Sequence, residues 1–250
     1  MLIDTHLHLA NEGYDLEEVI ENAKNRNVKF LIVSGSDNVD NRANLELLKY
    51  ENIFLTAGFH PASVSDLSLE DFLFLEELIK SNDRVVAIGE IGLDYHYGKD
   101  NKEEQIILFR RQLELAEKYN MPVVIHTRDA FLDTYNILKD YNVKGVIHCF
   151  SGSLEVAKMF LDLGFYLGIG GVVTFSNSKL KDVVKEVGID NIVLETDSPY
   201  LSPLRGRKNE PANVRIVCNF IADFLNIDVS LVESVTSKNA IALFDLNVDL

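Results

Sequence analysis

The sequence contains little of what secreted or membrane-spanning proteins need. Its two cysteines, Cys149 and Cys218, lie far apart, so no disulfide framework is expected in a chain of 250 residues. No apolar run approaches the roughly 20 residues of a membrane span, and no basic stretch with an apolar segment opens the chain. These absences predict no membrane association and a cytoplasmic location.

Positive charge is also scarce. Twenty-four Lys and Arg residues stand against 39 Asp and Glu, which gives a formal net charge of −15. This balance argues against a broad basic surface that binds duplex nucleic acid non-specifically. A polyanionic substrate in a small cleft remains compatible with it, because bound metal ions reverse the local field.

Linkers, low-complexity tracts and long charge blocks are absent as well. The composition, 47% hydrophobic and 25% charged, is ordinary for a globular protein. An α/β barrel of roughly 250 residues forms one domain. We therefore expect a single domain over residues 1–250.

Short β-rich apolar runs alternate with amphipathic stretches along the whole chain. The predicted strands are 2–8, 29–34, 53–59, 85–90, 122–127, 145–150, 165–170 and 191–197. The predicted helices are 15–26, 40–50, 68–80, 103–119, 130–141, 153–163, 178–187, 212–225 and 230–244. The clearest helical stretch, 102–119, has Ile106, Phe109, Leu113 and Ala116 near helical spacing.

Eight strands, each followed by a helix, predict an α/β fold of the (β/α)8 TIM barrel type. Alternation fixes parallel strands but not closure, so a doubly wound open sheet remains an alternative. No Gly-rich dinucleotide or phosphate-binding fingerprint follows a strand, which disfavours the nucleotide-binding form of that alternative.

Titratable residues gather where the predicted strands end. Five of the six histidines lie at or just after such an end, the face at which barrel enzymes build active sites, and His96 lies in a loop at the same face. Any one histidine alone is more simply a hydrogen-bonded core or surface residue. Together, converging imidazoles and carboxylates need a cation to compensate them, which predicts a metal site at the C-terminal mouth. The converging residues are His6, His8, Glu90, His126, His148 and Asp197.

The first predicted strand carries Asp4, His6 and His8 at every second position. Side chains at i and i+2 point to the same side of a strand, so the two histidines can bind one ion together. Asp4 lies deeper and has two interpretations. It orients an imidazole by accepting a ring N–H, or it is a polar residue of the barrel layer with another partner.

Seven motifs resemble, in order, those of the TatD family of metal-dependent hydrolases. They are IDTHLH (3–8), GFHP (58–61), AIGEIGLDY (87–95), VIHTR (124–128), IHCFSG (147–152), ETDSPYL (195–201) and RGRKNEP (205–211). The resemblance runs from residue 2 to the NAIALF at 239–244. It implies an amidohydrolase-like barrel and a metal-dependent deoxyribonuclease with 3′–5′ exonuclease activity on DNA or nucleotide phosphodiesters.

Carried over residue by residue, the resemblance implies two divalent metal ions. Their ligands would be His6, His8 and Asp197 for one ion, His126 and His148 for the other, and Glu90 bridging both. The substrate phosphate contacts would be His60, Arg128, Arg205 and Arg207. Imidazole-rich ligand sets suit zinc, manganese, iron or nickel, whereas activity in the family is associated with magnesium, so Mg, Mn, Zn and Ni all stay open.

The residue types also suggest a mechanism. Four imidazoles and two carboxylates offset half the charge of two divalent ions, which leaves positive charge for a phosphodiester. Asp197 could accept a proton as water is activated. His60 could stabilise charge on the phosphoryl oxygens, which we favour, or protonate the leaving group. The predicted catalytic residues are Glu90, Asp197 and His60.

Two other functions remain in competition. One is hydrolysis of a small amide, ester or aminoacyl-tRNA, although Glu90 stands where a lysine-carbamate amidohydrolase has lysine. The other is a non-catalytic metal-bound scaffold. Among the remaining residues, Cys149 is expected to pack, Phe175 could line the pocket, and Tyr95 and Tyr200 could stack a terminal base or only cover the mouth. The sequence leaves the oligomeric state open, a monomer included.

Overall fold

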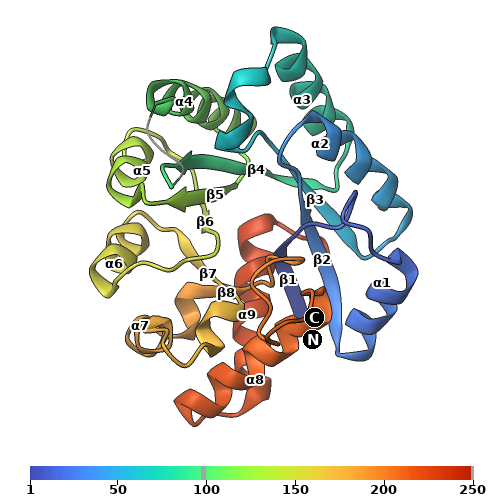
Figure 1. Ribbon diagram of the computed structural model, residues 1–250, viewed down its shortest axis with the longest axis vertical. Coiled ribbons are helices and arrows are strands. Elements are labelled where there is room, and N and C mark those ends of the chain that lie inside the picture. The colour runs from blue at the N-terminus through green and yellow to red at the C-terminus, as the bar shows by residue number, and fades with distance from the viewer. Residues whose placement is uncertain (97–99, 249–250) are drawn as a thin grey trace.

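A computed structural model describes residues 1–96 and 100–248 (Figure 1). The expected domain of residues 1–250 therefore includes positions 97–99 and 249–250, which lie outside the described residues. Eight parallel strands follow one another in sequence order around a single sheet. The strands are β1 (Leu2–Leu7), β2 (Val28–Ser34), β3 (Ile53–Ala57), β4 (Val85–Asp94), β5 (Val123–Arg128), β6 (Gly145–Ile147), β7 (Tyr166–Ile169) and β8 (Ile192–Leu194).

Helices connect the strands and surround the sheet (Figure 1). The α-helices are α1 (Leu16–Asn25), α2 (Asn38–Leu45), α3 (Leu69–Ser81), α4 (Lys102–Tyr119), α5 (Phe131–Leu138), α6 (Leu154–Asp162), α7 (Leu180–Val187), α8 (Val214–Leu225) and α9 (Val229–Phe244). The 3-10 helices are η1 (Glu46–Lys49), η2 (Pro61–Asp66), η3 (Gly171–Thr174), η4 (Ile189–Asn191) and η5 (Pro211–Asn213). In the described part of the chain, none of the helices combines the length and the apolar character that crossing a bilayer requires.

The last strand closes the sheet against the first. The Thr5 hydroxyl donates to the Leu194 carbonyl at 3.0 Å. Beyond the end of β8, the Asp197 N–H donates to the His6 carbonyl at 2.9 Å, and the His8 N–H donates to the Ser198 carbonyl at 2.8 Å. These contacts confirm the predicted barrel over the open sheet, and they bring two distant ligand-bearing segments together.

An apolar cluster fills the barrel on the side of the strand amino ends. It combines residues from seven strands with the last two turns of α9, a set that can meet only inside the barrel. A second, larger cluster packs the outer faces of the strands against the surrounding helices. The interior cluster consists of Ile3, Ile32, Phe54, Val86, Ala87, Val124, Val146, Val193, Ala240, Leu243, Phe244 and Leu246.

Several strands end earlier than the sequence predicts. β3 ends at Ala57, β6 at Ile147 and β8 at Leu194, and the chain turns sharply after the last two. Cys149 and Asp197 have φ angles of 47° and 55°, in the left-handed region that cannot continue a ladder. β4 instead extends to Asp94, because its last residues continue to pair with β5 after the pairing with β3 has ended.

Two helix predictions also need correction. The stretch predicted as one helix over 40–50 is divided between α2 and η1. On α4, Ile106 is only partly buried, whereas Gln105 and Gln112 join Phe109 on the buried face. Apolar spacing could not show this, because the amides find backbone partners described below.

Candidate metal centre

The six predicted metal ligands lie together at the carboxyl ends of the strands. His6 is in β1, His8 directly follows the end of β1, Glu90 is in β4, and His126 is in β5. His148 comes immediately after β6, and Asp197 lies on the irregular segment after β8. Residues far apart in the sequence thus share one mouth, as the strand-end pattern predicts.

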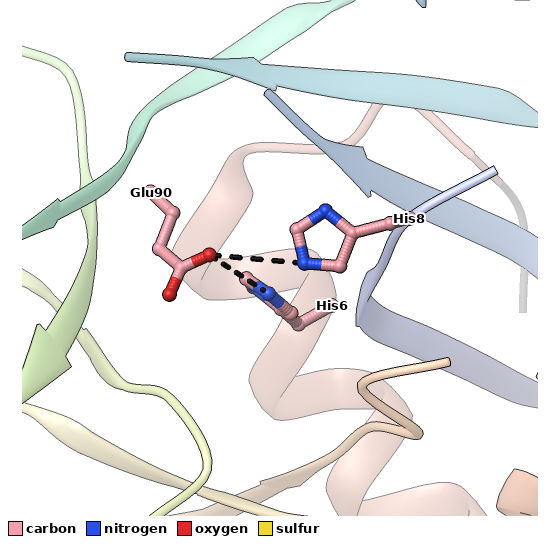
Figure 2. Close-up of side chains that lie close together, drawn as sticks. All are labelled: His6, His8 and Glu90. Atoms are coloured by element: carbon pink, nitrogen blue, oxygen red, sulfur yellow. Dashed lines mark ion pairs between the residues drawn. The ribbon is translucent and has the colours of Figure 1, made fainter. Parts of the chain in front are cut away.

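Glu90 occupies the middle of this group. One carboxylate oxygen, Oε2, lies 3.5 Å from His6 Nε2 and 3.8 Å from His8 Nε2 (Figure 2). The other, Oε1, lies 2.7 Å from His126 Nδ1 and 3.1 Å from His148 Nε2. Each oxygen faces a different pair of imidazoles, which is the arrangement a carboxylate bridging two ions requires.

Asp197 faces the first of these pairs. Its Oδ1 lies 3.7 Å from the Nε2 atoms of both His6 and His8. The His148 ring stacks on the His6 ring with 3.8 Å between centroids, so His148 is close to both positions. In the described residues, three sets of side chains place possible metal-ligand atoms within 4.8 Å of one another. They are His6–His8–Glu90, His6–His148–Asp197 and His60–Glu90–His126.

A chain of hydroxyl groups fixes the tautomer of His6. The Thr56 hydroxyl donates to the Gly89 carbonyl at 2.9 Å and lies 2.8 Å from the Ser34 hydroxyl, which therefore donates to it. Ser34 must then accept from His6 Nδ1, 3.2 Å away. The lone pair of His6 is left on Nε2, which is buried, faces the site and has no hydrogen-bond partner.

Two further imidazoles have carboxylates behind them, His126 within hydrogen-bond distance and His148 in a looser ion pair. Asp94 Oδ2 lies 3.0 Å from His126 Nε2, and Glu195 Oε1 lies 3.5 Å from His148 Nδ1. Such partners fix the ring orientation and leave the opposite nitrogen for a metal. The sequence interpretation did not assign Asp94 or Glu195 a role, although both are acidic residues near strand ends, the signal that identified Glu90 and Asp197.

His60 differs from His6 in which ring nitrogen carries the proton. Its Nδ1 accepts the Ala62 N–H at 3.1 Å, so in the neutral ring the proton is on Nε2, which lies 3.8 Å from Glu90 Oε1. Burial lowers the pKa of His60 to about 4, which keeps the ring neutral. Because its cavity-facing nitrogen carries a proton, His60 is suited to donate a hydrogen bond rather than to bind a metal.

The site balances buried charges against one another. Burial disfavours the charged form of Glu90, but the neighbouring imidazoles, His148 foremost, hold its pKa well below the usual range. Burial also lowers the pKa of His148, yet the Glu90 and Glu195 carboxylates together outweigh it and raise that pKa well above the ordinary value. Burial lowers the pKa of His6 to about 4 and raises that of Asp197 to about 6.

These residues fit divalent cations. Five of the six predicted ligands, all but the fully buried His6, line a cavity of about 380 Å³, whose lining includes five carboxyl groups and the Arg128 guanidinium. The lone pair on the buried His6 Nε2 faces two carboxylates, an arrangement that a cation satisfies and a hydrogen bond does not. The carboxyl groups lining the cavity are Glu12, Asp40, Glu90, Asp94 and Asp197.

The structure distinguishes between the two interpretations that the sequence left open for Asp4 and for Tyr95. Asp4 contacts no imidazole: it accepts the Thr196 N–H at 2.9 Å and the Thr196 hydroxyl at 2.6 Å, and so anchors the segment that carries Asp197. Tyr95 is buried and donates its hydroxyl to Asp133 at 3.0 Å, so it covers the mouth and cannot stack a base. No group of candidate metal-binding side chains found in the described residues includes Cys149.

The other predicted contacts differ in position. His60, Arg128 and Tyr200 line the cavity, and Tyr200 is 55% exposed. Arg205 and Arg207 are exposed on the loop after β8, outside the cavity lining. Phe175, which directly follows η3, also lies outside the cavity lining. Asn209 anchors the base of that loop by donating to the Thr196 and Tyr200 carbonyls at 2.8 and 2.7 Å.

A closed (β/α)8 barrel with a histidine and carboxylate cluster at its carboxyl mouth defines the class of metal-dependent barrel hydrolases. Residues 3–245 match the family model described as TatD related DNase. The chain therefore belongs to the TatD family, as its motifs predict, and is a metal-dependent hydrolase.

Two curated relatives and one solved structure illustrate the similarity. The chain is 43% identical to the uncharacterized metal-dependent hydrolase YabD of Bacillus subtilis, over 99% of this chain and 100% of that protein. It is 35% identical to the putative deoxyribonuclease TATDN3 of Mus musculus, over 97% and 88% of the two chains. The crystal structure of YJJV, a TatD homolog from Escherichia coli, superposes with a TM-score of 0.92 at 29% identity, covering 98% of each chain.

Proposed function

We propose that this chain hydrolyses phosphodiester bonds in DNA and removes nucleotides from a 3′ end. One observation supports the proposal: a cavity whose floor gathers imidazoles and carboxylates that fit cations also has hydrogen-bond donors for an anion on its wall. The His60 Nε2–H and the Arg128 guanidinium supply those donors. The names of the family model and of the mouse relative support the choice of DNA.

We propose that two divalent ions, Mg, Mn, Zn or Ni, are held by the six predicted ligands. One ion would lie with His6, His8 and Asp197, the other with His126 and His148, and Glu90 would reach both. When bound, such ions acidify water and stabilise the attacked and leaving oxygens of a phosphodiester.

The chain's own residues would supply the remaining steps. Asp197, whose pKa burial raises to about 6, is suited to take a proton near neutral pH. His60 stays neutral and would donate its Nε2–H to a phosphoryl oxygen, which favours charge stabilisation over protonation of the leaving group. Arg128 would bind the phosphate in the cavity, with Arg205 and Arg207 contacting phosphates farther along the strand.

The size of the cavity supports action at a chain end. A volume of about 380 Å³ is typical of small-ligand sites. It suits one terminal nucleotide, and the acidic residues Glu12 and Asp40 on its wall would repel a continuous phosphate backbone.

The test uses metal-loaded protein with single-stranded and 3′-recessed DNA in Mg²⁺ or Mn²⁺. We expect mononucleotides to be released by the wild type and by Glu76→Gln, a control on α3, but not by Glu90→Gln. Inert DNA with turnover of aminoacyl-tRNA or small esters would contradict the proposal in favour of the second hydrolase. A protein that turns over no ester but binds a partner would favour the scaffold.

A further inference from the structure

Two glutamines occupy the buried face of α4. Gln112 is fully buried and Gln105 is 3% exposed. They are seven residues apart, two helical turns, so both amides point toward the barrel. The rest of that face is apolar, with Leu108, Phe109 and Leu113. A buried amide is unfavourable unless its oxygen and nitrogen are both hydrogen-bonded. The partners of these two side chains therefore indicate why glutamine occupies the two positions.

Each glutamine binds both polar groups of one backbone residue. Gln112 Oε1 accepts the Phe59 N–H at 2.7 Å, and its Nε2 donates to the Phe59 carbonyl at 3.0 Å. Gln105 Oε1 accepts the Asp94 N–H at 2.9 Å, and its Nε2 donates to the Asp94 carbonyl at 2.9 Å. The side-chain amide therefore pairs as the peptide group of a neighbouring strand would.

These pairs lie where strand pairing has stopped. The ladder between β3 and β4 ends at Ala57 and Ile88, and the carboxyl end of β4 pairs only with β5. Beyond that point, Phe59 and Asp94 would have backbone groups with no strand partner on this side. The two glutamines supply the missing partners from a rigid helix.

Phe59 and Asp94, the two residues that the glutamines bind, adjoin the candidate metal centre. Phe59 directly precedes His60, whose cavity-facing N–H is described above. Asp94 places its carboxylate 3.0 Å from His126 Nε2, and its Oδ1 accepts the His96 N–H at 2.9 Å. A shift of either backbone segment would therefore move an imidazole at the site.

We propose that Gln105 and Gln112 are positioning residues of the metal centre. Gln105 acts through Asp94 and sets the orientation of His126. Gln112 acts through the backbone of Phe59 and sets the position of His60. The role of Gln112 in hydrolysis rests on the proposed function, whereas that of Gln105 in metal binding does not.

Gln105→Met tests the first assignment, because methionine keeps the volume and loses both hydrogen bonds to Asp94, together with the bond that Nε2 donates to Asn101 Oδ1 at 2.9 Å. Calorimetric titration of metal-free protein with Mn²⁺ should show affinity about tenfold or more below wild type. The control is Asn239→Leu at the opposite end of the barrel, which also loses two bonds from a side-chain amide, to the Ile189 and Ile192 carbonyls. It should lower the melting temperature without changing Mn²⁺ affinity.

A double-mutant cycle separates positioning from general stability. In an Asp94→Ala background, Gln105→Met should weaken Mn²⁺ binding no further. Equal Mn²⁺ affinity in Gln105→Met and Asn239→Leu, or additive losses in the cycle, would overturn the assignment. If methionine prevents folding, Gln105→Glu and Gln112→Glu keep the shape and one acceptor oxygen but replace the donor with a carboxyl oxygen that faces a backbone carbonyl, and the same changes are expected.

Gln112→Met tests the second assignment. Its Mn²⁺ affinity should stay within about twofold of wild type, while kcat for DNA falls about tenfold or more because His60 is misplaced. In a His60→Ala background the same change should have no further effect on kcat. Weakened Mn²⁺ binding, or a loss that adds to that of His60→Ala, would overturn it.

A substrate-independent measurement covers the case in which wild-type protein binds Mn²⁺ but cleaves no phosphodiester. That result alone would reject the proposed function. Inorganic phosphate would then be titrated into the Mn²⁺-loaded proteins, with a dissociation constant about tenfold higher expected in Gln112→Met and in His60→Ala. An unchanged constant in Gln112→Met beside a raised one in His60→Ala would reject the positioning role.

Discussion

The two halves of the barrel interior differ in chemistry along the same strands. Toward the amino ends, apolar residues pack against one another and against α9. Toward the carboxyl ends, the same strands carry imidazoles and carboxylates. The change takes only a few positions, from Ile3 to His6 on β1 and from Val124 to His126 on β5.

This difference separates what stabilises the fold from what prepares the site. The amino half buries apolar surface and stabilises the barrel without any ligand. The carboxyl half buries charged groups whose positions are set by other buried groups, and these favour a cation. Substitutions in the two halves should therefore have separable effects on unfolding and on metal binding.

Glu90→Gln should give the largest effect in the carboxyl half. The substitution removes the charge that faces both pairs of imidazoles, so activity should fall by about 10³-fold or more. Calorimetry should also show at least one Mn²⁺ fewer per chain than in wild type. Wild-type metal content in Glu90→Gln would show that Glu90 does not link the two positions.

Phe244→Ala tests the amino half. Phe244 is buried in the interior cluster, and removing a buried ring should lower the free energy of unfolding by about 3–5 kcal/mol. Metal affinity of the folded fraction should be unchanged. Urea unfolding followed by Mn²⁺ titration measures both quantities, and a large loss of affinity would mean that the halves are not separable.

Glu195→Gln should have an intermediate effect. Glu195 lies beside His148 Nδ1 and accepts the Cys149 N–H at 2.5 Å. Loss of its charge should weaken metal binding about 10–100-fold, with little change in unfolding. Gly168→Ala offers a matched test, because an added Cβ would lie 2.3 Å from Glu195 Oε2. If Gly168→Ala binds metal as wild type does, the position of Glu195 is not important.

A pH dependence confined to the carboxyl half should accompany these losses. Although burial lowers the pKa of His148 and of His126, neighbouring carboxylates raise both above the ordinary value. Metal must displace these protons, so affinity should fall as pH falls, by about tenfold per unit for each proton displaced. Calorimetry of Mn²⁺ binding between about pH 8 and pH 6 measures the slope. A flat profile would contradict the raised pKa values.

The sequence predicts the fold because strand and helix periods alternate clearly through all eight units. Strand ends are less predictable: apolar runs continue through IHCF, yet β6 stops at Ile147 because Cys149 adopts a left-handed conformation. The backbone conformation of the residues that follow, rather than their composition, decides where such a strand ends.

The convergence of the six predicted ligands follows from their positions at strand ends. The residues that orient the ligands could not be predicted from sequence position. Ser34 and Thr56, for example, are ordinary strand residues, and their hydrogen-bond chain to His6 depends on the register of β2 and β3. Gln105 and Gln112 look out of place on an apolar helix face until their backbone partners are known. Asp4 shows the same limit, because its partner Thr196 is 192 residues away.

The most direct measurement of the central claim is anomalous scattering from crystals of the wild-type protein soaked with Mn²⁺. We expect two peaks about 3.5–4 Å apart at the carboxyl mouth, both in contact with Glu90. Peaks elsewhere on the chain, or none at saturating Mn²⁺, would contradict it.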